Sequence, residues 1–280
     1  MSKRKKILIL GGEGFVGRNL ADSLLKKYDC HSADIEESKF ERGKRKDNFI
    51  KTNPYKNKIE NDYDAIIHLV DSGESGGIFE KNESRLIKNI GLNKKNHLII
   101  VSSAAVYSSP NSDYGKRKTA LEKIYSDYCD KNRIKLTIFR LFNTYGPYQI
   151  PNRQGSLIAN ILVNYLNKKT TEINDKAAMR DFIFSGDIGK FVHYAIQNSI
   201  TGTIDLATNR LILINEMIKA IEKNVVKKKL PLVYKNIKEN SICPSAKNKL
   251  LKKIKITSLN DGFKKTLFFY KKNIKIINGL

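Results

Sequence analysis

The stretch ILILGGEGFVG, residues 7–17, decides the fold, because a short apolar strand runs directly into a glycine-rich turn. Gly12, Gly14 and Gly17 follow the GxGxxG spacing, and Gly11 precedes them. Glycines let the backbone turn tightly and approach a pyrophosphate, whose charge the N-terminus of the next helix attracts. The spacing alone is weak evidence, because glycine turns also join strands to helices for steric reasons.

Asp34 strengthens this interpretation. It ends the next predicted strand, DCHSADI, at residues 29–35. An acid at this place can accept hydrogen bonds from a ribose hydroxyl and repel a 2'-phosphate; the less favoured alternative is an ordinary solvated acid in a turn. Together the two features predict a dinucleotide cofactor, with NAD preferred to NADP.

Short apolar or β-branched runs recur along the chain and alternate with helical patterns. The predicted strands are residues 5–10, 29–35, 64–70, 96–103, 134–142 and 202–207, and helical patterns cover residues 15–28 and 117–132. This alternation predicts an α/β protein with a doubly wound parallel sheet that binds ligands at the carboxyl ends of its strands.

A second, smaller lobe is predicted beyond about residue 146, where the pattern loosens into helices and loops. We assign residues 1–145 and 182–208 to a cofactor-binding core. Residues 146–181 and 209–280 are assigned to the lobe.

Composition excludes several classes of protein. The formal charge of +24 comes mostly from lysines spread along the chain, so we attribute it to compositional bias rather than to a dedicated nucleic-acid-binding face. A positive surface still attracts anionic substrates. The apolar run in the start MSKRKKILILGG is too short for a signal peptide, and no stretch approaches the ~20 apolar residues of a membrane span. We therefore expect a cytoplasmic protein.

The three cysteines, Cys30, Cys129 and Cys243, are odd in number and lack metal-binding spacing. We expect them to be packing residues, and no metal site is indicated.

Candidate catalytic residues follow the fourth predicted strand. This strand ends in Ser102 and Ser103, and Tyr114 and Lys118 come next, one helical turn apart. Ser103 can hold a sugar hydroxyl while Tyr114 exchanges its proton, and Lys118 can reach the tyrosine oxygen and a cofactor ribose. Serines also form turns, and lysine is frequent in this chain. The glycine turn and Asp34 make coincidence the poorer explanation.

Seven motifs then occur in the order of a known family. They are GGEGFVG (11–17), DYDAIIHLV (62–70), VSSAAVYS (101–108), YGKRK (114–118), RLFNTYGP (140–147), RDFIFSGDI (180–188) and SLNDGFKKTLFFYKK (258–272). With these motifs the chain resembles the NAD-dependent epimerase/dehydratase family. These are extended short-chain dehydrogenase/reductases that act on nucleotide sugars, as UDP-glucose 4-epimerase does. The resemblance implies a Rossmann sheet that binds NAD and a lobe that binds a nucleotide-diphosphate sugar. It is also compatible with a homodimer formed through the Tyr114 helix.

The resemblance also assigns roles to residues. Ser103, Tyr114 and Lys118 fall on the catalytic triad, in which Ser103 also contacts the substrate sugar. Asn143 and Arg180 fall on positions that contact the substrate diphosphate. The implied cofactor contacts are Gly11, Gly12, Gly14, Phe15, Val16, Gly17, Asp34, Leu69, Tyr114 and Lys118.

Alternatives stay open for two of these residues. A guanidinium suits phosphate oxygens, but Arg180 could instead form a salt bridge to Asp181 or Asp187. Asn143 could be a local turn residue.

Some positions depart from the family pattern. The linker from Ser103 to Tyr114 is shorter than usual, and Val70 and Asp71 replace small alanines after the HL pair. Relatives that dehydrate sugars carry an Asp-Glu pair where this chain has two alanines, at 104 and 105, so a 4,6-dehydratase is disfavoured.

The sequence therefore predicts an NAD-dependent nucleotide-sugar oxidoreductase. We expect a 4-epimerase that recycles its NAD, in the synthesis of sugars for surface polysaccharides. The alternative is a 4-keto-sugar reductase that consumes NADH. An alternative of another class is a catalytically idle scaffold that binds RNA or membrane through its basic surface and the segment GFKKTLFFYKKNIKIIN (262–278).

Overall fold

The structure is a computed structural model that describes residues 4–40, 48–153, 156–235, 237–239 and 248–280. Its internal contacts divide the chain into two compact units. Unit 1 comprises Met1–Leu141 and Ile188–Asp205, and unit 2 comprises Phe142–Asp187 and Leu206–Leu280. The assignment of the cofactor to one unit and of a nucleotide sugar to the other stays a prediction.

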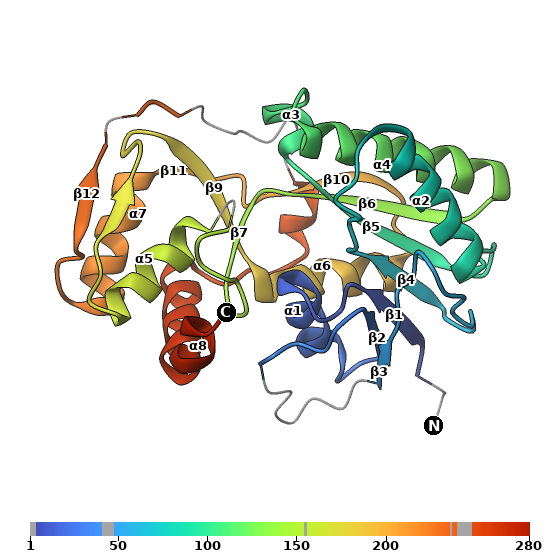
Figure 1. The fold of residues 1–280 in the computed structure, drawn as a ribbon, viewed down its shortest axis with the longest axis horizontal. Helices are drawn as coiled ribbons and strands as arrows, with labels where there is room; N and C mark the ends of the chain where they lie inside the picture. Colours follow the sequence, from blue (N-terminus) through green and yellow to red (C-terminus); the bar gives the residue numbers. More distant parts are fainter. Residues whose placement is uncertain (1–3, 41–47, 154–155, 236, 240–247) are drawn as a thin grey trace. The chain divides into compact units, whose positions relative to one another are not determined.

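A seven-stranded sheet forms the centre of unit 1 (Figure 1). Its strands, in spatial order, are β10 (Gly202–Leu206), β6 (Lys135–Leu141), β5 (His97–Ser103), β4 (Ala65–His68), β1 (Lys6–Leu10), β2 (Asp29–Asp34) and β3 (Asn48–Lys51). Every adjacent pair from β6 to β3 is parallel. The strand order reverses between β1 and β4, which is where sheets of this kind bind ligands at their carboxyl edge.

Helices cover both faces of this sheet, because successive residues of a strand point to opposite sides. α2 (Gly76–Ile90) and α4 (Asp113–Asn132) pack on the face that carries Leu8. α1 (Phe15–Leu24) and the unit 1 part of α6 (Ser185–Asn198) lie on the other side (Figure 1). The predicted α/β class and doubly wound parallel sheet are thereby confirmed.

The six strands predicted from the sequence correspond to β1, β2, β4, β5, β6 and β10. β3 was not predicted, because its four residues are too few to show an alternating pattern. Cys30 and Cys129 are buried free thiols, and burial raises the pKa of Cys129 to about 12. Cys243 lies outside the described residues.

The described part of unit 2 contains two small sheets and several helices. β7 (Asn143–Tyr145), β9 (Met179–Phe184) and β11 (Leu211–Leu213) form one sheet, and β8 (Thr171–Ile173) pairs with β12 (Leu232–Tyr234). The helices are α5 (Leu157–Leu166), α7 (Ile214–Ile221) with a π-helical extension at Glu222–Val226, a 3-10 turn at Lys249–Lys252, and α8 (Leu259–Asn278). Apart from the strand at 202–207, the sequence predicted helices and loops beyond residue 146, and this was wrong for β8, β9, β11 and β12. Three of these strands have only three residues and are too short to show alternation.

An aromatic cluster holds the start of α8 against the sheet of unit 2. The Tyr145 ring centroid lies 5.1 Å from that of Phe263 and 5.8 Å from that of Phe184. A β-carbon at Gly262 would lie 2.1 Å from the Tyr145 hydroxyl oxygen, so glycine permits this close approach. One side of α8 is therefore buried in unit 2.

Candidate active site

The glycine turn joins β1 to α1 at the carboxyl edge of the sheet. Gly11 has a φ of +81°, and its N–H donates to the backbone oxygen of Ala33 at 2.8 Å. A β-carbon at Gly17 would lie 2.3 Å from the backbone oxygen of Gly11, so only glycine permits this packing. Gly14 is exposed and begins α1, whose first turn carries no acidic residue. The turn therefore offers helix amides and the positive end of the helix dipole to a pyrophosphate.

Glu13 lies inside this turn, and its carboxylate is paired with Arg18. The Glu13 side chain is 2% exposed, and its Oε2 accepts from Nη1 of Arg18 at 3.0 Å and from the N–H of Ser38 at 3.2 Å. The pair neutralises the carboxylate inside unit 1. Phe15 and Val16 are half-buried at the start of α1. Glu13 is therefore compatible with a phosphate at the turn.

Asp34 ends β2, and its carboxylate contacts the glycine turn at Glu13. Its Oδ2 accepts from the N–H of Glu13 at 3.1 Å, and its Oδ1 accepts from the N–H of Ile35 at 2.8 Å. Partial burial raises the pKa of Asp34, while the two N–H groups act in the opposite direction. A carboxyl group beside a glycine turn can accept hydrogen bonds from ribose hydroxyls, so the residues present fit NAD.

Leu69 completes this edge of unit 1. Its N–H donates to the backbone oxygen of Leu10 at 3.0 Å, and a β-carbon at Gly11 would lie 3.3 Å from the Leu69 backbone. The segment that follows β4 thus lies against the glycine turn. The structure brings the glycine turn, Asp34 and Leu69 together at one edge of the sheet.

Tyr114 and Lys118 share one face at the start of α4. Lys118 Nζ lies 5.4 Å from the centroid of the Tyr114 ring. Ser103 ends β5, and its Oγ accepts from the N–H of Ala105 at 3.2 Å. Within residues 97–132, all of which the structure describes, no hydrogen bond joins Ser103 to Tyr114. The structure therefore joins the tyrosine to the lysine, whereas the serine is held by its own turn.

The short linker before α4 folds tightly against that helix. It forms α3 (Ala105–Ser108) and a turn in which Ser112 Oγ accepts from the N–H of Gly115 at 3.0 Å. A β-carbon at Gly115 would lie 2.0 Å from the backbone oxygen of Ser109. Gly115 therefore allows a linker this short to place Tyr114 in the first turn of α4.

Asp71 faces the predicted catalytic lysine. Its Oδ2 lies 3.3 Å from Lys118 Nζ, and its Oδ1 accepts from Arg117 Nε at 3.1 Å and from the N–H of Gly73 at 3.0 Å. Partial burial by itself raises the pKa of Asp71, but the charge of Lys118, the N–H of Gly73 and the charge of Arg117 hold it below its usual value. A carboxylate therefore lies beside Lys118 in the neutral pH range.

A second carboxylate fixes the strands around this site. Glu122 on α4 accepts from Arg140 Nε at 2.9 Å and from Ser102 Oγ at 2.6 Å. Arg140 also donates to the Tyr107 hydroxyl, which in turn donates to Asp205 Oδ1 at 3.0 Å. The hydrogen bond to Glu122 raises the pKa of Arg140. These contacts tie α4 to the ends of β5, β6 and β10.

A buried polar cluster supports the end of β4. His68 Nε2 lies 2.9 Å from Glu83 Oε2, and the hydroxyls of Tyr55 and Tyr125 donate to the same carboxylate at 2.8 and 3.0 Å. Burial by itself raises the pKa of Glu83, but the charge of His68 and these hydrogen bonds hold it below its usual value. The cluster links β4 to α2 and α4, just before the segment that carries Leu69.

Asn143 and Arg180, the residues predicted to bind the diphosphate, lie on neighbouring strands of unit 2. Asn143 Nδ2 donates to the backbone oxygen of Asp181 at 3.1 Å. Arg180 Nη1 donates to the backbone oxygen of Met179 at 2.9 Å, and its Nη2 lies 2.7 Å from Glu239 Oε2. Both residues therefore lie in one small sheet, and Arg180 has an acidic partner.

The two acids considered as partners of Arg180 make other contacts. Asp181 Oδ1 accepts from the N–H of Thr208 at 2.7 Å, and Asp187 Oδ2 accepts from the N–H of Thr257 at 2.7 Å. Burial raises the pKa of Asp181, against the hydrogen bonds from Thr208. These acids tie β9 and α6 to later segments of the chain.

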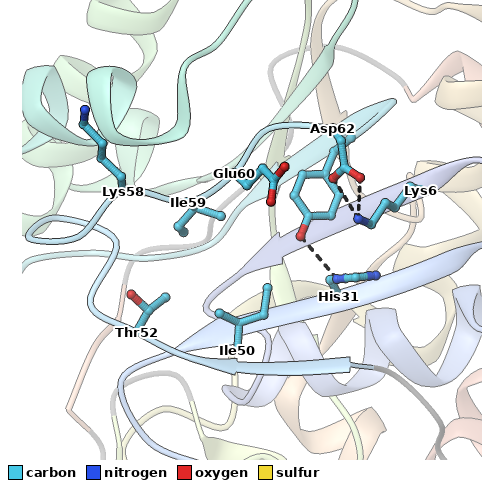
Figure 2. Close-up of a pocket in the computed structure, with 9 residues that line it drawn as sticks. Lys6, His31, Ile50, Thr52, Lys58, Ile59, Glu60 and Asp62 are labelled. Atoms are coloured by element: carbon cyan, nitrogen blue, oxygen red, sulfur yellow. Dashed lines mark hydrogen bonds and ion pairs between the residues drawn. The ribbon is translucent and has the colours of Figure 1, made fainter.

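A pocket of about 330 Å³ lies elsewhere in unit 1 (Figure 2). Lys6, which begins β1, lines it and forms an ion pair with Asp62 at 2.6 Å. The Tyr63 hydroxyl lies 3.2 Å from His31 Nδ1 across the pocket. Gly11 follows the opposite end of β1, so this pocket is separate from the glycine turn.

Sequence reasoning missed the two carboxylates that face predicted site cations. Asp71 departs from the family pattern directly after β4, and that departure was a signal that the segment differs. No pattern in the sequence singled out Glu239, which is 59 residues from Arg180.

Comparisons with known proteins agree with this fold. UDP-glucuronic acid decarboxylase 2 of Arabidopsis thaliana is 25% identical over 264 residues, which cover 80% of this chain and 58% of that protein. This chain therefore spans less than two thirds of the length of that relative. UDP-glucuronate 4-epimerase of Thermodesulfobacterium geofontis is 24% identical over 330 residues, covering 98% of each chain.

A solved structure shows the same fold. It is a UDP-N-acetylglucosamine 4-epimerase from Methanobrevibacter ruminantium in complex with UDP-N-acetylmuramic acid. The TM-score is 0.79 at 21% identity, and the alignment covers 97% of this chain and all of that one. The sequence profile of one family matches residues 7–206, which include the glycine turn, Asp34, Tyr114, Lys118 and Arg180. The chain thus belongs to the NAD dependent epimerase/dehydratase family.

Proposed function

We propose that this chain is a nucleotide-sugar 4-epimerase that oxidises a sugar hydroxyl transiently and recycles its NAD. The observation that carries the proposal is the Tyr114–Lys118 pair, with Nζ 5.4 Å from the ring, in the unit that also holds the glycine turn and Asp34. A role of the product in polysaccharide synthesis stays a prediction.

Each residue has a distinct task in this proposal. When bound, NAD would supply the chemistry of accepting a hydride from the sugar carbon and returning it. Tyr114 takes the hydroxyl proton and gives it back, and Lys118 stabilises the phenolate by its charge. Ser103 orients the sugar hydroxyl. Asn143 and Arg180 hold the diphosphate, to which a guanidinium can donate two parallel hydrogen bonds.

UDP-glucuronate is the first substrate to test, because both relatives described above are named for it. It also raises a second candidate reaction. Oxidation at C4 creates a ketone β to the carboxylate carbon, and such a compound can lose carbon dioxide. The likeness to a decarboxylase favours this outcome, whereas the likeness to an epimerase favours return of the hydride.

One incubation separates these reactions. The purified protein is given UDP-glucuronate or UDP-glucose labelled with deuterium at C4, without added cofactor, and products are analysed by mass spectrometry and NMR. Epimerisation gives a product of unchanged mass that keeps the label. Decarboxylation gives a product that lacks carbon dioxide.

The two remaining alternatives give other results. A 4-keto-sugar reductase would convert a 4-keto-sugar only with NADH and take its hydrogen from it. A protein that retains no NAD(H) and turns over no nucleotide sugar would support the scaffold and overturn the enzyme assignment.

A further inference from the structure

One face of α8 carries a stripe of lysines around an exposed aromatic side chain. We define the α8 stripe as Lys264, Phe268, Lys271, Lys272 and Lys275, all of which are exposed. The spacing of Lys264, Phe268, Lys271 and Lys272 places them on one side of the helix. The backbone leaves helical φ and ψ values at Asn273, so Lys275 continues the stripe beyond a kink. Phe268 is 72% exposed, more than any other large hydrophobic residue that the structure describes.

The opposite side of α8 is fixed in unit 2. Phe263, Leu267, Tyr270 and Ile277 are buried, and Tyr270 donates to the backbone oxygen of Gln149 at 2.8 Å. The stripe therefore cannot rotate inward without the loss of this packing. It is a constant feature of the surface of unit 2.

The stripe differs from the other 20-residue helix of the described chain in having almost no acids beside its lysines. α4 has the same length of 20 residues, and it mixes signs: Asp113, Glu122, Asp127 and Asp130 alternate with basic residues. There Lys123 forms an ion pair with Asp127 at 2.8 Å. α8 carries a single acid, Asp261, which lies in its first turn and contacts the capping Ser258. Both helices carry five basic residues, so α8 differs from α4 in its lack of acids and not in the number of its bases.

The lysines of the stripe have no acidic partner among the residues that the structure describes. Within the described residues, no ion pair engages Lys264, Lys271, Lys272 or Lys275. Neighbouring Lys265 instead places its Nζ 5.6 Å from the Phe184 ring. Four like charges along one helical face repel one another, and an anionic surface would remove that repulsion.

We propose that the α8 stripe docks unit 2 on the surface of an anionic lipid bilayer. Clustered lysines on a helix are attracted to anionic headgroups, and an aromatic side chain among them can enter the interface. No helix in the described ranges is long and apolar enough to cross a membrane. The proposal does not depend on the reaction that the chain catalyses.

A lipid surface fits the stripe better than RNA. Phe268 stands in the middle of the four lysines, where an interface accepts its ring without any specific partner. The arginines that usually form bidentate contacts to phosphates are absent from α8, which has lysines only. The observed combination of point charges with one apolar side chain suits a fluid layer of headgroups.

Vesicle sedimentation tests the charge component. The full chain is mixed with phosphatidylcholine vesicles, with or without phosphatidylglycerol, at low and high salt. We expect binding only to the anionic vesicles, weakened by salt. Replacement of Lys264, Lys271, Lys272 and Lys275 by Gln should weaken it at least about tenfold.

The matched control changes the same number of exposed lysines elsewhere. Lys81, Lys88, Lys94 and Lys95 lie on α2 and the turn after it, and their replacement by Gln gives the same net charge. This variant should bind like the unaltered protein. Equal weakening in both variants would show that only the total charge matters, and would overturn the proposal.

A fluorescence experiment tests Phe268 directly, because the chain contains no tryptophan. Phe268→Trp introduces a single probe in the stripe, and Ile78→Trp introduces one at an exposed position of α2. Anionic vesicles should shift the emission of the first probe to shorter wavelength and leave the second unchanged.

Two further results would overturn the proposal. One is the absence of a shift for Phe268→Trp together with the absence of sedimentation on anionic vesicles. The other is stripe-dependent binding of a labelled single-stranded RNA by a chain that ignores the vesicles. Both measurements are made on protein whose thermal unfolding, followed by circular dichroism, matches that of the unaltered chain.

Discussion

Two cations that the sequence assigns to the site, Lys118 in unit 1 and Arg180 in unit 2, each face a carboxylate that was not predicted. The side chain of Lys118 is 8% exposed and that of its partner Asp71 is 23% exposed. The side chain of Arg180 is 12% exposed, and that of its partner Glu239 is 37% exposed. The two ion pairs thus differ in how far the acid reaches into solvent.

The difference indicates different roles. Asp71 is held by Arg117 and by the N–H of Gly73 as well, so it stays beside Lys118. Glu239 also accepts a hydrogen bond, from Asn174 Nδ2 at 2.9 Å, but it is the more exposed acid. An ion pair this close to solvent contributes only about 0–1 kcal/mol. If Arg180 binds the diphosphate as proposed, the substrate would displace Glu239 from it, whereas Asp71 would stay beside Lys118.

The largest expected effect comes from the residue next to Lys118. Tyr114→Phe keeps the ring and its contact with the lysine but removes the hydroxyl that would move the proton. General acid–base catalysis contributes roughly 10²-fold to 10⁴-fold in rate, so turnover should fall by at least about 10²-fold. Steady-state kinetics measure this, and NAD and nucleotide-sugar binding should persist.

Tyr128→Phe is the matched control, because it removes a hydroxyl from the same helix, where that group contacts the backbone oxygen of Leu92. Its turnover should be unchanged. Near-normal turnover of Tyr114→Phe would remove this residue, and with it the role of Lys118, from the chemistry.

Arg180→Ala tests the other side of the comparison. The change should weaken nucleotide-diphosphate binding by about 1.5–3 kcal/mol, the range for a hydrogen bond to a charged group, and leave NAD affinity alone. Calorimetry with UDP and with NAD measures both. Arg85→Ala, at an exposed position of α2, should change neither. Equal loss of both ligands, or of neither, would exclude Arg180 from the substrate site.

Asp34→Ala tests whether the Asp34 carboxylate contacts the cofactor ribose. Unlike Asp71 and Glu239, this carboxylate accepts from backbone N–H groups and not from a cation. Loss of this carboxylate should reduce the preference for NAD over NADP by about tenfold, or about 1.4 kcal/mol. The measurement is the ratio of the two dissociation constants. Asp29→Ala, at the opposite and exposed end of β2, is the control. An unchanged ratio in Asp34→Ala would show that the carboxylate does not contact the ribose.

The parts of the molecule that were predicted correctly depend on local sequence. The turn requires a φ of +81° at position 11 and a close backbone contact at position 17. Both requirements favour glycine, so the glycines in the sequence reveal the turn. Buried strands such as β1 and β5 contain continuous apolar runs, ILIL in β1 and LIIV in β5. The spacing of Tyr114 and Lys118 follows directly from one helical turn.

The features that were missed depend on distant segments. Asp71 approaches Arg117 across 46 residues, and Glu239 approaches Arg180 across 59. Periodicity carries no information about such pairs, because any of the chain's 28 acids could approach any of its 52 bases. Only the packing of the loop after β4 on α4 selects Asp71.

The smallest expected effect compares the two acids directly. Asp71→Asn keeps the shape but removes a negative charge beside Lys118, so the positive charge acts more strongly on a phenolate at Tyr114. The acid limb of the pH profile of kcat/KM should therefore move to lower pH, by roughly half a unit. Glu239→Gln makes the same chemical change beside Arg180; it should leave this limb in place and tighten UDP binding up to about fivefold. A limb that stays fixed in Asp71→Asn, or moves equally in both variants, would show that Asp71 does not influence the site through its charge.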